Sequence, residues 1–244
     1  MAGYENFRIY FPGGEQLMFL CSKRRFMWYV DREIADVWPD NPGYATLKFT
    51  PKGHGDPDMV RQRVNICVMC GGTECLTSHH VVPLCFRKFL PTIYKDHNSY
   101  DIVLLCEDCH HKYERIATEY KTELIKKYVS QDVLDRNRLI TSGRKKLGAM
   151  KIHAGKIPLD KLTDLQNKLT DILIALNMTE QELEMREPTN VYRHVVLNSH
   201  FTHGELILGW KRHFVEFAKP KFLPDWWDVN KIKMANDQNK FLYG

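Results

Sequence analysis

The chain has 244 residues, of which 43% are hydrophobic and 27% charged, and its formal net charge is +5. These values are ordinary for a globular protein. No stretch approaches the roughly 18 apolar residues that cross a bilayer, and the amino terminus lacks a basic and then apolar signal sequence, so the pattern argues against a membrane span and a secretory signal.

The first part of the chain, residues 1–60, predicts a small β-rich module. Short alternating segments at residues 7–11 and 45–50 are separated by the turn-forming sequences at 12–14 and 41–43. This is the pattern of strands and turns, and a short helix is predicted near residues 31–38. The Gly- and Pro-rich residues 51–57 predict a linker into the next region.

Four of the seven cysteines form two CxxC pairs, Cys67 with Cys70 and Cys106 with Cys109. Random placement of seven cysteines in such a chain would produce roughly 0.2 such pairs. Four thiolates suit one tetrahedral Zn²⁺, so we predict a structural zinc site. Reduced, metal-binding thiols favour an intracellular compartment. Nucleus or cytoplasm is preferred because no mitochondrial presequence is evident, and the mitochondrion is left open.

Three histidines lie beside these cysteines and are not needed for the zinc site: His79, His80 and His110. Hydrolysis of a phosphodiester needs an activated water and a cation that balances the growing charge. A histidine can accept a proton near neutral pH. Because neighbouring residues of a strand face opposite sides, His79 and His80 are expected to have different roles.

The order CxxC, His-His-Val-Val-Pro and Asp-Ile-Val-Leu-Leu-Cys-x-x-Cys-His resembles the zinc-stapled HNH (ββα-metal) nucleases over residues 64–118. The resemblance implies a β-hairpin carrying the histidine pair, followed by a helix that begins near the second CxxC. By position, His80 matches the general base, and His79 and His110 match the ligands of a catalytic Mg²⁺ or Mn²⁺. If the residues after His110 are helical, Glu114 lies one turn further on the same face and could be a third ligand.

The chain departs from that family at the middle letter of HNH, where Asp101 occupies the position that is commonly Asn. In the family this residue braces a loop by hydrogen bonds. Aspartate can accept such bonds but has no amide donors. Asn98 is therefore a second candidate for the brace.

After Cys109 the hydrophobic pattern becomes helical. One continuous helix is predicted over residues 110–129, a second over 131–148 with a break near Gly143, and a third over 159–176 that ends near Asn177. Thr179 and Glu182 have the spacing of a capping box, and residues 206–217 predict a further helix. We therefore divide the chain at residues 61 and 131, into an amino-terminal β module, a central HNH-like domain (61–130) and a helical region (131–244).

The excess of positive charge falls in residues 119–244, where a polyanion such as nucleic acid would be attracted. Candidate phosphate contacts are Arg144, Lys145, Lys146, Lys211 and Arg212. These residues form two clusters, 144–146 and 211–212. For either cluster taken alone, a solvated helix face is the preferred alternative. Trp226 and Trp227 could stack on bases, but packing of the tail against the core is the favoured interpretation.

Residues 96–101 and 220–227 also resemble the carboxy-terminal region of 3′–5′ exonuclease-domain proteins. No counterpart of their DEDD exonuclease domain is found here, so exonuclease activity is not predicted. We expect an α+β protein that cleaves DNA or RNA as a metal-dependent HNH-type endonuclease. The alternative is a catalytically silent zinc module that binds nucleic acid or a protein partner.

Overall fold

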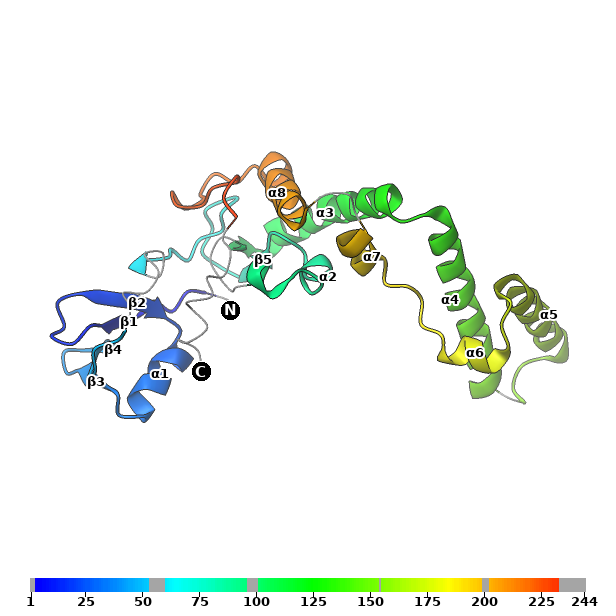
Figure 1. Cartoon of the computed structure of the whole chain (residues 1–244), viewed down its shortest axis with the longest axis horizontal. Coiled ribbons are helices and arrows are strands. Elements are labelled where there is room, and N and C mark those ends of the chain that lie inside the picture. The colour runs from blue at the N-terminus through cyan, green and yellow to red at the C-terminus, as the bar shows by residue number, and fades with distance from the viewer. Residues whose placement is uncertain (1–2, 53–59, 96–100, 154, 199–201, 233–244) are drawn as a thin grey trace. The chain divides into compact units, whose positions relative to one another are not determined.

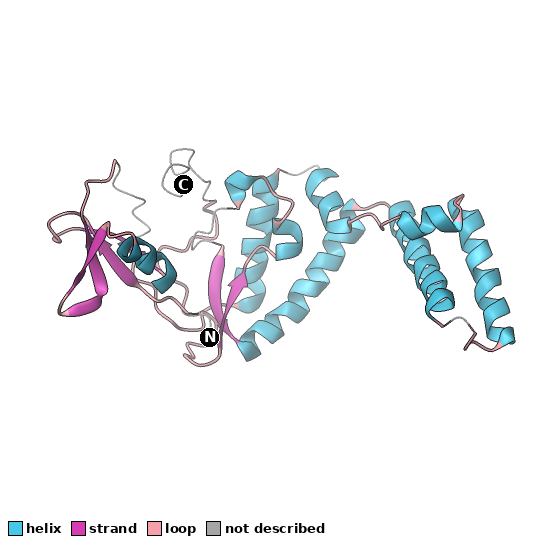
Figure 2. Ribbon diagram, turned by 90° about the horizontal axis from the view of Figure 1, so that it is seen from below, coloured by secondary structure: helices cyan, strands magenta, loops and turns pink. Residues whose placement is uncertain are grey.

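The computed structural model describes residues 3–52, 60–95, 101–153, 155–198 and 202–232, and its fold is of the mixed α+β class that the sequence predicts (Figure 1). The chain separates into two compact units. Unit 1 comprises residues 1–81, 97–114 and 210–233, and unit 2 comprises residues 82–96, 115–209 and 234–244. Among the described residues every strand belongs to unit 1, whereas unit 2 is helical (Figure 2).

The first part of unit 1 is a four-stranded sheet with the strand order β2-β1-β4-β3. Its strands are β1 (Phe7–Tyr10), β2 (Leu17–Cys21), β3 (Ala35–Trp38) and β4 (Asn41–Leu47). The pairing of β1 with β4 is parallel, and the other two pairings are antiparallel. Ile9, Phe19 and Ala45 of these strands pack with Phe26 in one buried cluster. The sheet confirms the strands predicted near residues 7–11 and 45–50, but residues 41–43, predicted as a turn, begin β4, and the turn lies at residues 39–40.

The helix predicted near residues 31–38 is wrong in its position. Helix α1 spans Lys23–Asp31 and begins where the Ser22 side chain accepts a hydrogen bond from the Arg25 amide. Residues 35–38 form β3 instead, because β4 supplies hydrogen-bond partners to their backbone. Pairing with the strand that follows two residues later therefore outweighs the local helical pattern.

The second part of unit 1 is a hairpin of β5 (Leu76–His80) and β6 (Ile102–Cys106), and α3 (Glu107–Tyr128) follows it without a loop. The antiparallel register places His79 opposite Val103 and His80 opposite Ile102. Helix α3 confirms the continuous helix predicted over residues 110–129, and it begins three residues earlier. Helix α8 (His203–His213) and the π-helical turn η3 (Phe214–Ala218) cover the segment predicted at residues 206–217.

Unit 2 contains residues 115–128 of α3, residues 203–209 of α8 and the remaining described helices: α2 (Leu84–Arg87), the 3₁₀ turn η2 (Thr92–Tyr94), α4 (Gln131–Ile152), α5 (Leu159–Leu176), α6 (Glu180–Met185) and α7 (Val191–Asn198). Helices α4, α5 and α6 share a buried core that includes Ile140, Leu169 and Leu183. Asn177, in the left-handed conformation, ends α5, and the capping box of Thr179 with Glu182 starts α6, both as predicted. None of the described helices is both long and apolar enough to span a bilayer.

The break predicted near Gly143 is wrong, because α4 continues through this residue to Ile152. Gly143 is buried, and a β-carbon there would lie 2.8 Å from Leu183 Cδ2 and 3.1 Å from Ile172 Cγ2. The glycine therefore permits α4 to approach α5 and α6 closely. Close packing, and not a need for backbone freedom, explains its presence.

We expect Gly143→Ala and Gly148→Ala to change stability in opposite directions. Both glycines lie in α4, but a β-carbon at Gly148 meets no atom within 4 Å. Gly148→Ala should raise the free energy of unfolding by about 0.5–1 kcal/mol through helix propensity. Gly143→Ala should lower it by about 1–2 kcal/mol, because overpacking exceeds that gain. Chemical denaturation measures both, and equal effects would contradict the packing role of Gly143.

Candidate functional site

The two CxxC pairs come together in unit 1. The Sγ atoms of Cys67, Cys70, Cys106 and Cys109 all lie within 4.8 Å of one another. Cys70 Sγ and Cys106 Sγ are 3.7 Å apart. Thiolates on a tetrahedral Zn²⁺, with Zn–S distances near 2.3 Å, are about 3.8 Å apart. The four sulfur atoms therefore fit a single zinc ion.

The first pair is held by a tight turn whose amides face the ligands. The Gly71 amide donates to the Cys67 carbonyl at 2.8 Å, and the Cys67 amide donates to the Gly72 carbonyl at 2.7 Å. The Gly72 amide lies 3.4 Å from Cys70 Sγ. Gly71 has φ of +79°, a conformation that favours glycine. The Gly-Gly sequence after Cys70 thus permits the turn that presents both sulfurs to one point.

The electrostatics of the four thiols also favour a bound cation. Burial is the largest influence on Cys67 and raises its pKa, but backbone hydrogen bonds from Cys106, Cys70 and Met69 outweigh it and lower the pKa to about 7. Burial raises the pKa of Cys109, and its neighbouring thiols raise it further. Because negative charge on one sulfur opposes ionisation of the next, a dication is needed to hold all four as thiolates.

Replacing Cys106 by Ser should remove this zinc site. We expect less than one zinc per chain and a clearly lowered melting temperature, since the binding free energy of a structural zinc, on the order of 10 kcal/mol, is coupled to folding. Cys75→Ser is the matched control, because Cys75 is exposed and outside the four-cysteine cluster. Elemental analysis and thermal unfolding test the pair, and an unchanged zinc content in Cys106→Ser would refute the site.

A second cluster, formed by His79, His110 and Glu114, lies beside the first. His79 Nδ1 is 3.1 Å from His110 Nε2, and Glu114 Oε1 is 3.7 Å from the former and 3.9 Å from the latter. An ion about 2.1 Å from each ligand atom requires those atoms to be about 3–4 Å apart. His79 comes from β5, and the other two come from successive turns of α3. These three residues could therefore hold one divalent cation.

Thr77 orients the second histidine of this cluster. Its hydroxyl donates to the Leu105 carbonyl at 3.0 Å, so its oxygen is left to accept from His110 Nδ1 at 2.8 Å. With the proton on Nδ1, the lone pair of His110 is on Nε2, the atom that faces His79 and Glu114. Sequence reasoning missed Thr77. The sequence feature that could have identified Thr77 is its position two residues before His79, which places both side chains on the same face of the strand.

His79 is held by aromatic packing. Its side chain is 3% exposed and meets the Tyr113 ring edge-on, with centroids 5.2 Å apart and planes at 88°. Phe214 of η3 lies nearly parallel to it at 5.9 Å and 24°. The hydroxyl of Tyr113 is itself 3.0 Å from Nδ1 of the buried His213. This packing limits rotation of the His79 ring and prepares it for metal binding.

Thr77→Val, which keeps the side-chain volume and removes the hydroxyl, should weaken metal binding at His79, His110 and Glu114. We expect the affinity for Mn²⁺ to fall about 10- to 100-fold, as is usual when the group orienting a ligand histidine is lost. Thr77→Ser retains the hydroxyl and should bind Mn²⁺ nearly as the unmodified chain does. Titration of the zinc-loaded protein with Mn²⁺ provides the measurement. Equal affinities for Val and Ser variants would contradict the orienting role.

His80 lies on the opposite face of β5 from His79 and is partly exposed. Its Nδ1 is 3.6 Å from Asp101 Oδ2, and the carbonyl of Asp101 accepts a hydrogen bond from the Val81 amide at 2.8 Å. Asp101 therefore extends the β5–β6 pairing by one backbone hydrogen bond at the end where the connecting segment begins, while its carboxylate faces the imidazole of His80. The other candidate brace, Asn98, lies outside the described residues.

The structure does not fit the phosphate contact expected of Lys211. This side chain is 2% exposed, and its ammonium donates to the carbonyls of Asp228 and Lys231, both at 2.7 Å. It also lies 4.6 Å from the centroid of the Trp227 ring, and burial lowers its pKa to about 8. Lys211 thus fastens the segment after η3, whereas the neighbouring Arg212 is exposed.

The basic cluster of α4 is more accessible. Arg144 lies 2.7 Å from Glu187 Oε1, and the Lys146 ammonium donates to Ser142 Oγ at 2.7 Å, while Lys145 is exposed. These contacts fit the solvated helix face that was the preferred alternative for this cluster. Nucleic-acid binding by Arg144, Lys145, Lys146 and Arg212 stays a prediction.

Comparison with known proteins shows similarity to a part of longer chains. Exonuclease 3′-5′ domain-containing protein 2 of Mus musculus and of Homo sapiens is 26% identical over 257 aligned residues, covering 93% of this chain but 38% and 40% of those proteins. Protein RRP6-like 3 of Arabidopsis thaliana is 38% identical over 125 residues, half of this chain and 14% of that protein. No family model and no solved structure matches. The chain thus spans about two fifths of the mouse and human relatives, and the resemblance to exonuclease-domain proteins extends over most of it.

Proposed function

We propose that this chain is a metal-dependent nuclease with an HNH-type, or ββα-metal, endonuclease site. In this proposal His80 is the general base, and His79, His110 and Glu114 hold one Mg²⁺ or Mn²⁺. The observation that carries it is the 3.1 Å approach of His79 Nδ1 to His110 Nε2, with Glu114 Oε1 within 3.9 Å of both. Only chain folding brings these atoms, 31 residues apart in the sequence, to one point.

The order of the elements supports the same proposal. The hairpin β5–β6 carries the histidine pair, and α3 starts directly at the second CxxC pair. A ββα arrangement of this kind presents two ligands from the helix and one from the strand. In the proposed enzyme the four cysteines would hold a structural Zn²⁺ that braces the hairpin, with no part in bond breaking.

The chemistry follows from the positions of His80 and Asp101. Nδ1 of His80 faces the Asp101 carboxylate, so Nε2 is the nitrogen left to accept a proton from water. That water would attack phosphorus in line with the departing 3′ oxygen. A bound divalent ion supplies charge stabilisation for the leaving and phosphoryl oxygens. The products would carry 5′ phosphate and 3′ hydroxyl ends.

The names of the relatives support a role in nucleic-acid processing. The mouse, human and Drosophila melanogaster proteins are all named for a 3′-5′ exonuclease domain. This chain aligns with 38–43% of their lengths. Its described candidate metal sites consist mainly of histidines and cysteines, whereas a DEDD exonuclease site consists of acidic residues. We therefore assign it endonuclease chemistry on DNA or RNA.

His80→Ala should lower the rate of phosphodiester cleavage about 10²- to 10⁴-fold, the usual contribution of a general base. Zinc content and melting temperature should not change. The matched control is His153→Ala, which removes an exposed histidine at the end of α4. Cleavage of labelled DNA and RNA oligonucleotides, with and without Mg²⁺ or Mn²⁺, gives the rates.

Two results would overturn the proposal. One is a folded, zinc-loaded His80→Ala protein that cuts as fast as the unmodified chain. The other is an unmodified protein that binds oligonucleotides but cleaves neither DNA nor RNA with any of Mg²⁺, Mn²⁺, Ni²⁺ or Zn²⁺. The second result would favour the silent zinc module.

A further inference from the structure

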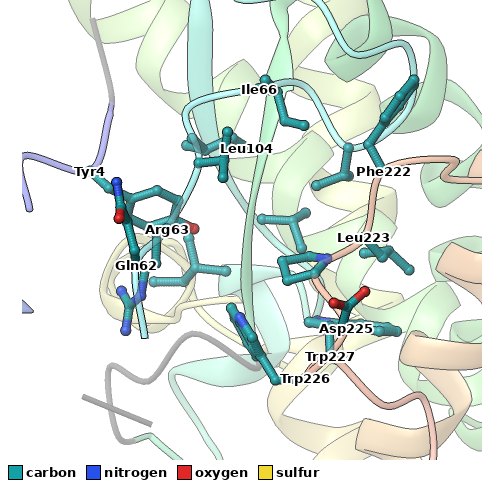
Figure 3. A pocket seen from close by; sticks show the side chains of 15 residues that line it. Tyr4, Gln62, Arg63, Ile66, Leu104, Phe222, Leu223, Asp225, Trp226 and Trp227 are labelled. Atoms are coloured by element: carbon teal, nitrogen blue, oxygen red, sulfur yellow. The ribbon is translucent and has the colours of Figure 1, made fainter. Parts of the chain in front are cut away.

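Unit 1 contains a cavity of about 360 Å³ that the proposed cleavage site does not use. It lies between strand β6, the segment before the first CxxC pair and the segment after η3 (Figure 3). Figure 3 shows Tyr4, Gln62 and Arg63 on one side of it and Phe222, Leu223 and Asp225 on the other. The size is within the range of small-ligand sites.

The walls combine flat aromatic surface with a few polar groups. Tyr4, Phe222, Trp226 and Trp227 contribute rings, while Ile102 and Leu104 of β6 contribute aliphatic surface. The polar side-chain groups of the lining residues are the guanidinium of Arg63, the amide of Gln62, the carboxylate of Asp225, the hydroxyl of Tyr4 and the indole N–H groups of the two tryptophans. A planar ligand with a polar edge suits such walls better than a purely apolar one.

Specific hydrogen bonds hold these walls in place. The Tyr4 amide donates to Asn65 Oδ1 at 2.6 Å, and Asn65 Nδ2 donates to the Tyr4 carbonyl at 2.9 Å. On the other side, the Phe222 amide donates to the Val68 carbonyl at 2.9 Å. A β-carbon at Gly71 would lie 3.0 Å from the Phe222 ring. The cysteine-bearing turn therefore supports this wall of the cavity directly.

The cavity adjoins the proposed general base. Ile102 lines it, and Ile102 is the residue directly opposite His80 in the β5–β6 hairpin. Paired residues of an antiparallel ladder share a face, and their β-carbons lie about 4.5–5.5 Å apart. A nucleotide beside a phosphate at His80 is thus within reach of the cavity.

We propose that this cavity receives one unstacked base of a nucleic-acid strand whose neighbouring phosphate lies at His80. The inference rests on the proposed nuclease function and adds its substrate class: single-stranded or locally opened nucleic acid. Trp226, only partly buried, would stack on the base, and the Arg63 guanidinium would face the polyanionic backbone. Within the described chain the indole N–H of buried Trp227 has no acceptor, and base carbonyls and ring nitrogens are acceptors.

A binding experiment without added Mg²⁺ or Mn²⁺ tests this inference, so that cleavage does not interfere. A short single-stranded oligonucleotide is compared with an abasic backbone of the same length and with the corresponding duplex. Trp226→Ala should weaken binding of the single strand about tenfold, because it removes the aromatic ring on which the base would stack. It should leave binding of the abasic backbone unchanged. Trp226→Phe should restore most of the affinity.

Trp28→Ala is the matched control, because Trp28 is a tryptophan of the amino-terminal module that is 40% exposed. It should bind all three ligands as the unmodified chain does. Equal losses for the single strand and the abasic backbone in Trp226→Ala would overturn the base site, as would capture of apolar peptides in place of oligonucleotides. Cleavage is measured separately, with Mg²⁺ or Mn²⁺ added. Base-dependent binding by a protein that does not cleave under those conditions would refute the nuclease mechanism alone, and cleavage without base-dependent binding would refute the base site alone.

Discussion

The junction between β6 and α3 is the constraint on which both clusters depend. Cys106 ends the strand, and Cys109 and His110 lie in the first turn of the helix that follows without a loop. Neighbouring residues of a helix are separated by about 100° of rotation, so Cys109 and His110 cannot face the same point. One meets the other cysteines, and the other meets His79. Any shift of this junction would therefore disturb the sulfur cluster and the imidazole cluster together.

The pleat of β5 divides the proposed chemistry between two faces. Thr77 and His79 are on the face that meets α3, where the hydroxyl orients His110 and aromatic rings hold His79. His80 is on the other face, with Asp101 beside it. Ile102, the residue opposite His80, lines the cavity of unit 1. In the proposed enzyme, metal binding and proton transfer would therefore occur on opposite sides of one strand, with the substrate phosphate at its end. This separation lets each side be tested by its own substitution.

Where local patterns misled, a contact with residues outside the segment was the cause. Residues 35–38 pair with β4, which no local helical pattern reveals. Gly143 resembles a helix breaker in the sequence, yet Leu183 and Ile172 occupy the space that a side chain would need. Lys211 resembles a surface cation, yet carbonyls about twenty residues later surround its ammonium. In each case the deciding partner lies outside the segment itself, so the helix propensity or charge of that segment carries no information about it.

The amino-acid sequence by itself determined the candidate metal ligands: two CxxC pairs, a histidine pair before Val-Val-Pro and a histidine after the second CxxC pair. It also determined the long helices after Cys109 and the capping box, because these depend on residues within a few positions of one another. Only the tertiary structure decided that His79, His110 and Glu114 converge and that Thr77 orients His110. It also decided that Trp226 is partly exposed whereas Trp227 is buried. The reason is physical: strand register and helix packing set those distances, and both arise from contacts between segments far apart in the chain.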